Sequence, residues 1–198
     1  MKKRPLPPKT ILHSEKGKKV FGGVRFDIYQ WSQKQFDGST ATYEIAKRQD
    51  SVIVMAIMDN EMVLVKEQQP HWPAPAHTLP AGMVEDDEDL EIAARRELEE
   101  ETGLIFKNYH LVHIEPTASI EWFGYTFIAS GFEGQKEKNL DAGERNEVVK
   151  FPLEKLLEMT RKKELFHRPR YIEEMLMQGK EEELFDAVKN PEKYSIPL

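Results

Sequence analysis

The sequence predicts an α/β fold of the α+β type, with strands and helices interleaved along one chain. Three observations favour it. The 198 residues fit one compact domain with a small addition. Apolar runs over 52–58 and 62–66 flank Asp59-Asn60, which is typical of a buried hairpin. Helix-like patterns then alternate with further strand-like segments, as expected for a sheet covered by helices.

The first fifty residues predict two parts in front of a main domain over 51–198. Lysines and prolines over 1–18 indicate a flexible basic arm. Residues 19–50 predict a small antiparallel β unit, because alternating patterns over 20–31 and 40–47 flank a turn. The first of these patterns places Phe26 on the core-facing side.

The main domain continues with elements that can be assigned in order. A loop rich in Pro and His follows the hairpin, and a helix ends at a glycine. The expected elements after the hairpin are a loop over 69–81, a helix over 86–103, strands over 110–115, 121–130 and 147–151, a loop over 131–146, and helices over 153–165 and 169–188.

Composition excludes several function classes. The chain has no cysteine, so disulfides and thiolate metal sites are excluded. No apolar run is long enough for a membrane span, and the basic N-terminus leads into prolines rather than a signal segment, so we expect a cytoplasmic protein without a membrane partner. A net charge of −7 argues against binding to nucleic acid. That acidity is local, because residues 85–101 hold ten carboxylates and two arginines.

The acidic segment places some of its carboxylates on the buried side of a helix. At about 100° per residue, Leu90, Ala94 and Leu98 share one apolar stripe. Glu97 and Glu101 lie within the same stripe and are expected to point inward. Inward carboxylates are costly unless a positive charge meets them.

The remaining positions of this helix strengthen the argument for a cation. Glu100 lies on the flank of the stripe, whereas Arg95 and Glu99 are expected on the solvated side. Carboxylates near a helix C-terminus oppose the helix dipole, and like charges at this spacing repel. Oxygen ligands alone suit Mg²⁺, with Mn²⁺ as a substitute. The alternative is a solvated glutamate-rich helix.

A fixed spacing runs from Gly82 to Leu104. Glu88 follows the glycine after five residues, and seven further residues lead to Arg96, where the row reads Arg-Glu-Leu-Glu-Glu-Glu-Thr-Gly-Leu. This pattern resembles the box of the Nudix hydrolases at every specified position. The resemblance implies a mixed sheet between helices, an α/β/α sandwich, with the box as loop, helix and loop.

The resemblance also implies roles for residues of the box. It assigns metal ligation to the Ala81 carbonyl, Glu97, Glu100 and Glu101. It assigns structural roles to Gly82, Glu88, Arg96 and Gly103. The N-terminal strand pair, the run Leu79-Pro80-Ala81-Gly82 before the box and the expected strand over 125–129 resemble the ADP-ribose pyrophosphatase branch. Members of that branch are usually homodimers joined through N-terminal strands.

The implied activity is Mg²⁺-dependent hydrolysis of the diphosphate bond in ADP-ribose or a related nucleoside diphosphate sugar. Its products are a nucleoside monophosphate and a sugar phosphate. Two alternatives remain: a sanitising hydrolase of nucleoside triphosphates or dinucleoside polyphosphates, and a non-catalytic module that senses a nucleotide.

Further site residues follow from what this reaction needs. The resemblance implies a general-base glutamate just before the late strand, and Glu144 is preferred to Glu147 because Glu144 lies in the loop whereas Glu147 abuts the strand. Glu100 is expected to support catalysis. The nucleoside base needs an aromatic partner. Among the exposed-aromatic candidates Phe26, Tyr29, Trp72 and Trp122, we expect Trp72 and Tyr29 to contact the substrate.

Overall fold

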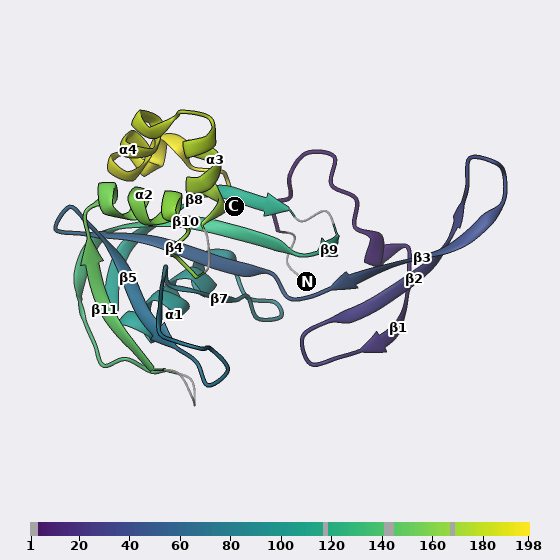
Figure 1. The fold of residues 1–198 in the computed structure, drawn as a ribbon, viewed down its shortest axis with the longest axis horizontal. Coiled ribbons are helices and arrows are strands. Elements are labelled where there is room, and N and C mark those ends of the chain that lie inside the picture. Colours follow the sequence, from purple (N-terminus) through teal and green to yellow (C-terminus); the bar gives the residue numbers. More distant parts are fainter. Residues whose placement is uncertain (1–3, 117–118, 141–144, 167–168) are drawn as a thin grey trace.

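Two β-sheets form the frame of the molecule, and Figure 1 shows them side by side. The computed structural model describes residues 4–116, 119–140, 145–166 and 169–198. The larger sheet has seven strands in the order β11-β5-β4-β10-β8, with β6 on β5 and β7 on β4. Its strands are β4 (Ser51–Met58), β5 (Glu61–Gln68), β6 (Ala76–Thr78), β7 (Ala81–Met83), β8 (Leu104–Pro116), β10 (Phe123–Gln135) and β11 (Arg145–Phe151).

Helices cover both faces of this sheet. The helices are α1 (Leu90–Thr102), α2 (Leu153–Lys162), α3 (Arg170–Met177) and α4 (Glu181–Lys189), with a final 3₁₀ turn at Pro191–Tyr194. Along β4, Val54 packs into the core shared with Leu98 of α1, whereas Met55 packs into the core shared with Leu156 of α2 and Ile172 of α3. Alternate residues of one strand thus face opposite helical layers. The expected α/β/α sandwich is confirmed.

Three of the four strands of the smaller sheet come from the N-terminal part of the chain, and this sheet projects from the sandwich (Figure 1). Its order is β1-β2-β3-β9. The strands are β1 (Lys18–Gly22), β2 (Asp27–Lys34), β3 (Thr40–Lys47) and β9 (Ile120–Glu121). β9 pairs in parallel with β3, and β10 begins two residues later in the larger sheet, so one segment links the two sheets.

The N-terminal segment differs from the sequence expectation in two ways. The pattern over 20–31 is a hairpin rather than one strand, because the chain turns at Gly23, whose N–H donates to the Phe26 carbonyl at 2.9 Å. Phe26 is consequently 36% exposed and not a core residue. The part of the expected flexible arm that the structure describes is held in place, since Arg4 pairs with Asp50 at 2.8 Å.

A buried polar cluster anchors the same segment. Ser14, in the 3₁₀ turn His13–Glu15, donates its backbone N–H to Glu121 at 2.8 Å, and its hydroxyl donates to the same carboxylate. Lys47 lies 2.9 Å from Glu121. Burial acts to raise the pKa of Glu121, but the Ser14 hydrogen bonds and Lys47 outweigh it and lower that pKa.

Other helices and strands begin or end at residues different from those expected from the sequence. The helix expected from residue 86 begins at Leu90, because the loop before it includes Asp87 at φ +61°. β10 continues to Gln135, into the expected loop over 131–146. The helix expected over 169–188 divides into α3 and α4 at Gly179, whose φ is +65°. Within the described ranges, no helix is both long and apolar enough to span a membrane.

Candidate active site

Helix α1 is held in place by its apolar stripe and by its C-terminal cap. Leu90, Ala94 and Leu98 are all buried, which is the face that the sequence predicts. Gly103 has φ +73°, and its N–H donates to the Glu99 carbonyl at 2.9 Å. A side chain at Gly103 would also lie 2.3 Å from the Lys136 carbonyl oxygen, so the position suits glycine on two grounds.

Arg96 joins the helix to the loop before it. Its Nε and Nη2 donate to the two oxygens of Glu88 at 2.9 and 3.0 Å, and Nη2 also donates to the Met83 carbonyl at 2.9 Å. Nη1 donates to Glu97 at 2.8 Å and to Glu100 at 3.2 Å. All five N–H groups of the guanidinium are therefore used. The hydrogen bonds from Arg96 hold the pKa of Glu88 below its ordinary value.

Glu97 lies against the backbone of β7. A Cβ atom placed on Gly82 would lie 1.9 Å from the Glu97 carboxyl carbon, so the carboxylate occupies the space that any other residue would fill. The Glu97 side chain is 14% exposed. Burial raises the pKa of Glu97, and Arg96 opposes that shift. The ionised form is thus held at an energetic cost, which an additional cation would reduce.

The other box carboxylates lie beside Glu97. The Ala81 N–H donates to Glu101 Oε1 at 3.4 Å, which places the end of β7 next to the C-terminal half of α1. Glu100 is more open, with 35% of its side chain exposed. The structure therefore brings together Ala81, Gly82 and the three glutamates, which come from two elements.

The donor set fits a hard divalent cation, although the present arrangement does not enclose one. Among the described residues, no group of three or more carboxylate or imidazole side chains is already arranged to hold a metal ion. Arg96 occupies oxygens of Glu97 and Glu100. The space over Gly82 and an all-oxygen set of carboxylates with the Ala81 carbonyl suit Mg²⁺-type ligation once those oxygens turn to the ion.

The aromatic candidates lie elsewhere. Trp72 is 8% exposed, and its ring packs on Phe166 with centroids 4.0 Å apart, so it already has an aromatic neighbour within the chain. Tyr29 lies on β2 between Lys19 and Ile45 in the projecting sheet, away from α1 (Figure 1).

The structure describes one of the two candidates for the general base. Glu144 lies outside the described residues. Glu147 is exposed on β11, opposite Lys66 of β5. Because β5 and β11 pair in this region, Glu147 lies on the sheet edge rather than in a loop.

The expectation of a solvated outer side of α1 is wrong. Arg95 donates to the Phe106 carbonyl at 2.6 Å and lies over the Tyr109 ring at 4.4 Å. Glu99 pairs with Lys136 at 2.5 Å and is only 17% exposed. The helix is therefore contacted on this side as well, by β8 and by the chain that follows β10.

Sequence reasoning also missed polar residues away from the box. Arg25 and Arg48 line a cavity between the projecting sheet and the loop before α1. Glu67 is buried on β5, and Gln69 donates to it at 2.6 Å. The sequence does hold an indication that Glu67 is buried. By strand alternation Glu67 shares a face with Val63 and Val65, and this face points to α1.

Comparison with known proteins agrees with the geometry. Residues 47–174 match the NUDIX domain family. The ADP-ribose pyrophosphatase of Bacillus subtilis (strain 168) is 30% identical over 166 residues, 81% of this chain and 87% of that protein. A methanol dehydrogenase activator of Bacillus methanolicus is 26% identical over 136 residues, 66% of this chain and 72% of that protein.

A solved structure extends the agreement to the fold. The crystal structure of an ADP compounds hydrolase superposes with a TM-score of 0.66 at 17% identity, covering 82% of this chain and 93% of that one. At this identity the likeness establishes the shared fold. With the family match over residues 47–174 and the relative at 30% identity, the chain belongs to the NUDIX family, and it is a hydrolase enzyme.

Proposed function

We propose that this enzyme hydrolyses the diphosphate bond of ADP-ribose or a related nucleoside diphosphate sugar with Mg²⁺, in the cytoplasm. The products are a nucleoside monophosphate and a sugar phosphate. The observation that carries the proposal is the convergence of Glu97, Glu100 and Glu101 beside Ala81 and Gly82. The name of the Bacillus subtilis relative supports the choice of substrate.

In this site the chain supplies ligands and fixes their direction. The Ala81 carbonyl, Glu97, Glu100 and Glu101 would hold the cation. A divalent cation held by these residues would offset the charge of the phosphoryl oxygens and lower the pKa of a water. Arg96 and Gly82 direct the Glu97 carboxylate.

Glu88 and the proposed base complete the machinery. Glu88 fixes Arg96 through two hydrogen bonds, so that helix and loop keep their register. We propose that the Glu144 carboxylate accepts the proton of the attacking water, with Glu147 as the second candidate.

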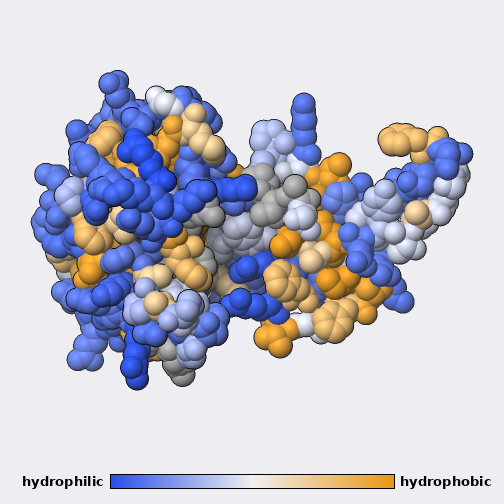
Figure 2. All heavy atoms as spheres, in the orientation of Figure 1, coloured by the Kyte–Doolittle hydropathy of each residue, from blue (hydrophilic) through white to orange (hydrophobic). Residues whose placement is uncertain are grey.

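The projecting sheet supports the proposal of a homodimer. Figure 2 shows apolar side chains gathered over this part of the surface. Val20 is 50% exposed, Phe21 60% and Tyr43 47%. Single exposed apolar residues are ordinary, whereas a group on one thin sheet favours a partner. Because Trp72 already packs on Phe166, Tyr29 of this sheet is the better candidate for stacking on a nucleoside base across a dimer.

A hydrolysis panel tests the proposed function. Products from ADP-ribose, nucleotide sugars, nucleoside triphosphates and dinucleoside polyphosphates are measured with and without Mg²⁺. We expect turnover of ADP-ribose or a nucleotide sugar that requires Mg²⁺. Glu97→Gln should lower kcat about 100-fold or more, because a displaced or missing ligand costs that much. Turnover of nucleoside triphosphates faster than that of ADP-ribose and the nucleotide sugars would contradict the proposed substrate class. No turnover of any compound would favour a nucleotide-sensing module.

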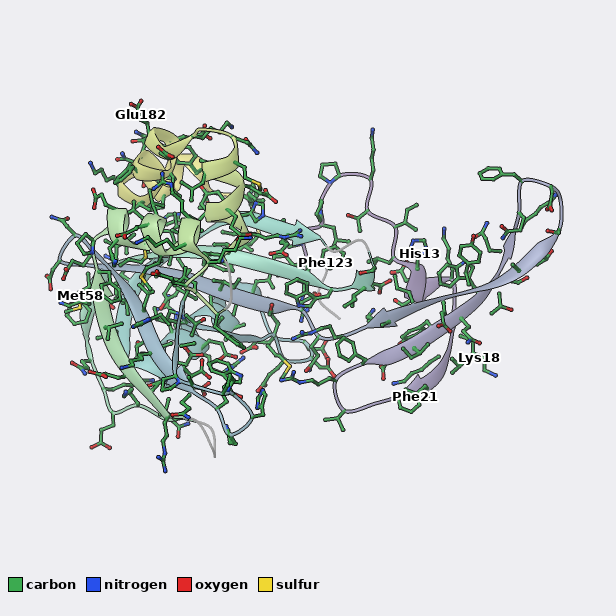
Figure 3. The ribbon with its side chains drawn as sticks, in the orientation of Figure 1. His13, Lys18, Phe21, Met58, Phe123 and Glu182 are labelled. Carbon is green, nitrogen blue, oxygen red and sulfur yellow. The ribbon has the colours of Figure 1, made fainter. Side chains whose placement is uncertain are left out.

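A matched control separates the site from general charge effects. Glu182 is exposed on α4, and Figure 3 labels it at the outer side of the helices. Glu182→Gln removes the same charge and should leave kcat unchanged. Glu144→Gln and Glu147→Gln, compared with it, identify the base: one should lower kcat without raising KM. Sedimentation velocity of the full chain tests the homodimer, and a monomer at micromolar concentration would contradict it.

A further inference from the structure

A cavity of about 610 Å³ lies between the two sheets, apart from the box carboxylates. The turn between β1 and β2 forms one wall, and the loop before α1 forms another. Phe123, the first residue of β10 and labelled in Figure 3, lies in the lining. Leu12 and Val84 add apolar surface. The cavity is large enough for part of a nucleotide-sized ligand.

Arg48 lies half-buried in this cavity, and its guanidinium has no hydrogen-bond acceptor among the described residues. Its guanidinium carbon is 5.6 Å from the Trp122 ring centre and 6.0 Å from the Phe26 ring centre. In the part of the chain that the structure describes, its side chain donates no hydrogen bond and forms no ion pair. Aromatic rings stabilise a guanidinium through its faces, and the N–H groups lie in its plane. The edge of Arg48 therefore remains available to an acceptor.

A second arginine increases the positive potential at this place. Arg25 is exposed at the cavity wall and also forms no ion pair with any described residue. Burial lowers the pKa of the Arg48 guanidinium, and the charge of Arg25 lowers it further. Two like charges held near each other are unfavourable unless an anion lies between them or beside them.

Among the described residues, no carboxylate of the lining forms an ion pair with Arg25 or Arg48. Of the two further cations, Arg4 is engaged by Asp50 at 2.8 Å and Lys47 by Glu121 at 2.9 Å. Asp27 is likewise engaged by Lys19. The exposed carboxylates Glu15 and Asp86 line the cavity, and neither forms an ion pair with Arg25 or Arg48. Within the described ranges, the cavity thus presents two guanidinium groups that no carboxylate of the chain pairs.

We propose that Arg25 and Arg48 form a subsite for a phosphate group of the substrate other than its diphosphate. The preferred substrates would then be nucleoside diphosphate derivatives that carry a further phosphate. A guanidinium binds a phosphate through two parallel N–H groups, and partial burial strengthens the contact. This inference rests on the proposed function, because it assigns a specificity to the same hydrolase.

Binding without a metal ion tests the subsite separately from turnover. Calorimetry of the full chain with a chelator compares AMP, adenosine 2′,5′-bisphosphate, adenosine 3′,5′-bisphosphate and inorganic phosphate. We expect one bisphosphate to bind about tenfold or more tightly than AMP, since one charged hydrogen-bonded contact is worth about that factor. Arg48→Gln and Arg25→Gln should each reduce this advantage to less than about threefold. Arg161→Gln, an exposed arginine on α2, should leave it intact.

The outcomes decide the proposal in each case. Equal binding of the three nucleotides by the unaltered chain would overturn it, as would an advantage that survives both substitutions. Inorganic phosphate binding as tightly as the bisphosphates, and lost in Arg48→Gln, would overturn the assignment to the substrate in favour of a free anion. If Arg48→Gln does not fold, the exposed Arg25→Gln variant decides. Failure here leaves the hydrolysis of unphosphorylated substrates unaffected, and the panel tests that separately.

Discussion

Replacing Gly82 by alanine should separate the geometry of the site from the stability of the fold. The new Cβ would lie 1.9 Å from the Glu97 carboxyl carbon, and real Cβ contacts are essentially never shorter than 3.0 Å. The carboxylate must therefore retreat by at least the difference, about 1.1 Å. A displacement of about 1 Å at a reacting centre can cost about 100-fold in rate, or roughly 2.7 kcal/mol of activation free energy.

The same substitution should cost little stability. The atom that must move is the end of a flexible side chain, so the strain is that of a changed rotamer, about 0.5–1.5 kcal/mol. For a chain of this length that corresponds to a fall in Tm of a few degrees. We therefore expect Gly82→Ala to fold, to unfold cooperatively, and to lose about 99% of its kcat.

The assay compares kcat and Tm with those of Gly134→Ala. A Cβ atom added to Gly134, on β10, would meet no described atom within 4 Å. This substitution therefore makes the same change from glycine to alanine without a clash. This control should keep kcat within about a factor of two. If Gly82→Ala were as active as the control, the position of the Glu97 carboxylate over Gly82 would not matter for the reaction.

Three further predictions follow from other contacts. Glu88→Gln should lower the free energy of unfolding by about 1.5–3 kcal/mol at neutral pH, because the fork to Arg96 loses its charge. The pKa of Glu88 is lowered from 4.5, so this contribution is present above that value, and denaturant titrations should find the difference shrinking as the pH falls below it. Ser14→Ala should cost about 1 kcal/mol by removing the hydroxyl bond to Glu121, and hydrogen exchange of the N-terminal segment should rise while that of α1 stays unchanged. Addition of Mg²⁺ at about 100 times its Kd should stabilise the chain by about 2.7 kcal/mol in thermal scans, and Glu101→Gln should lose most of this gain; an equal rise in both proteins would place the ion elsewhere.

The box helix could be predicted because its sequence carries the relevant physics locally. The apolar spacing of Leu90, Ala94 and Leu98 gives the buried face, and the same phase places Glu97 inward, where it is 14% exposed. Helical phase gives one direction only, however. It could not show that β8 and the chain after β10 contact the opposite side, where Arg95 and Glu99 find partners.

The N-terminal sheet was harder to predict because little of it is buried. The alternation over 20–31 has the period of a strand, but the sheet has two largely exposed faces, so the pattern does not report burial. The turn at Gly23 and the exposure of Phe26 follow from backbone hydrogen bonds that hydrophobic periodicity does not encode. Likewise, the cavity at Arg48 is formed by segments far apart in sequence, and no pattern within either segment predicts it.

The arrangement around Arg96 offsets the repulsion and burial of the carboxylates on the acidic helix. Glu97 is buried at a cost that shows in its raised pKa, and it lies beside Glu100 at a spacing where like charges repel. Arg96 offsets both costs with one N–H group on each carboxylate, while Glu88 and the Met83 carbonyl accept from the rest of the guanidinium. A divalent cation would bring two positive charges to the same oxygens. Its binding would break only the two hydrogen bonds from Arg96 to Glu97 and Glu100. Because the fork to Glu88 is separate from them, the helix can keep its register while its carboxylates turn from the arginine to the ion.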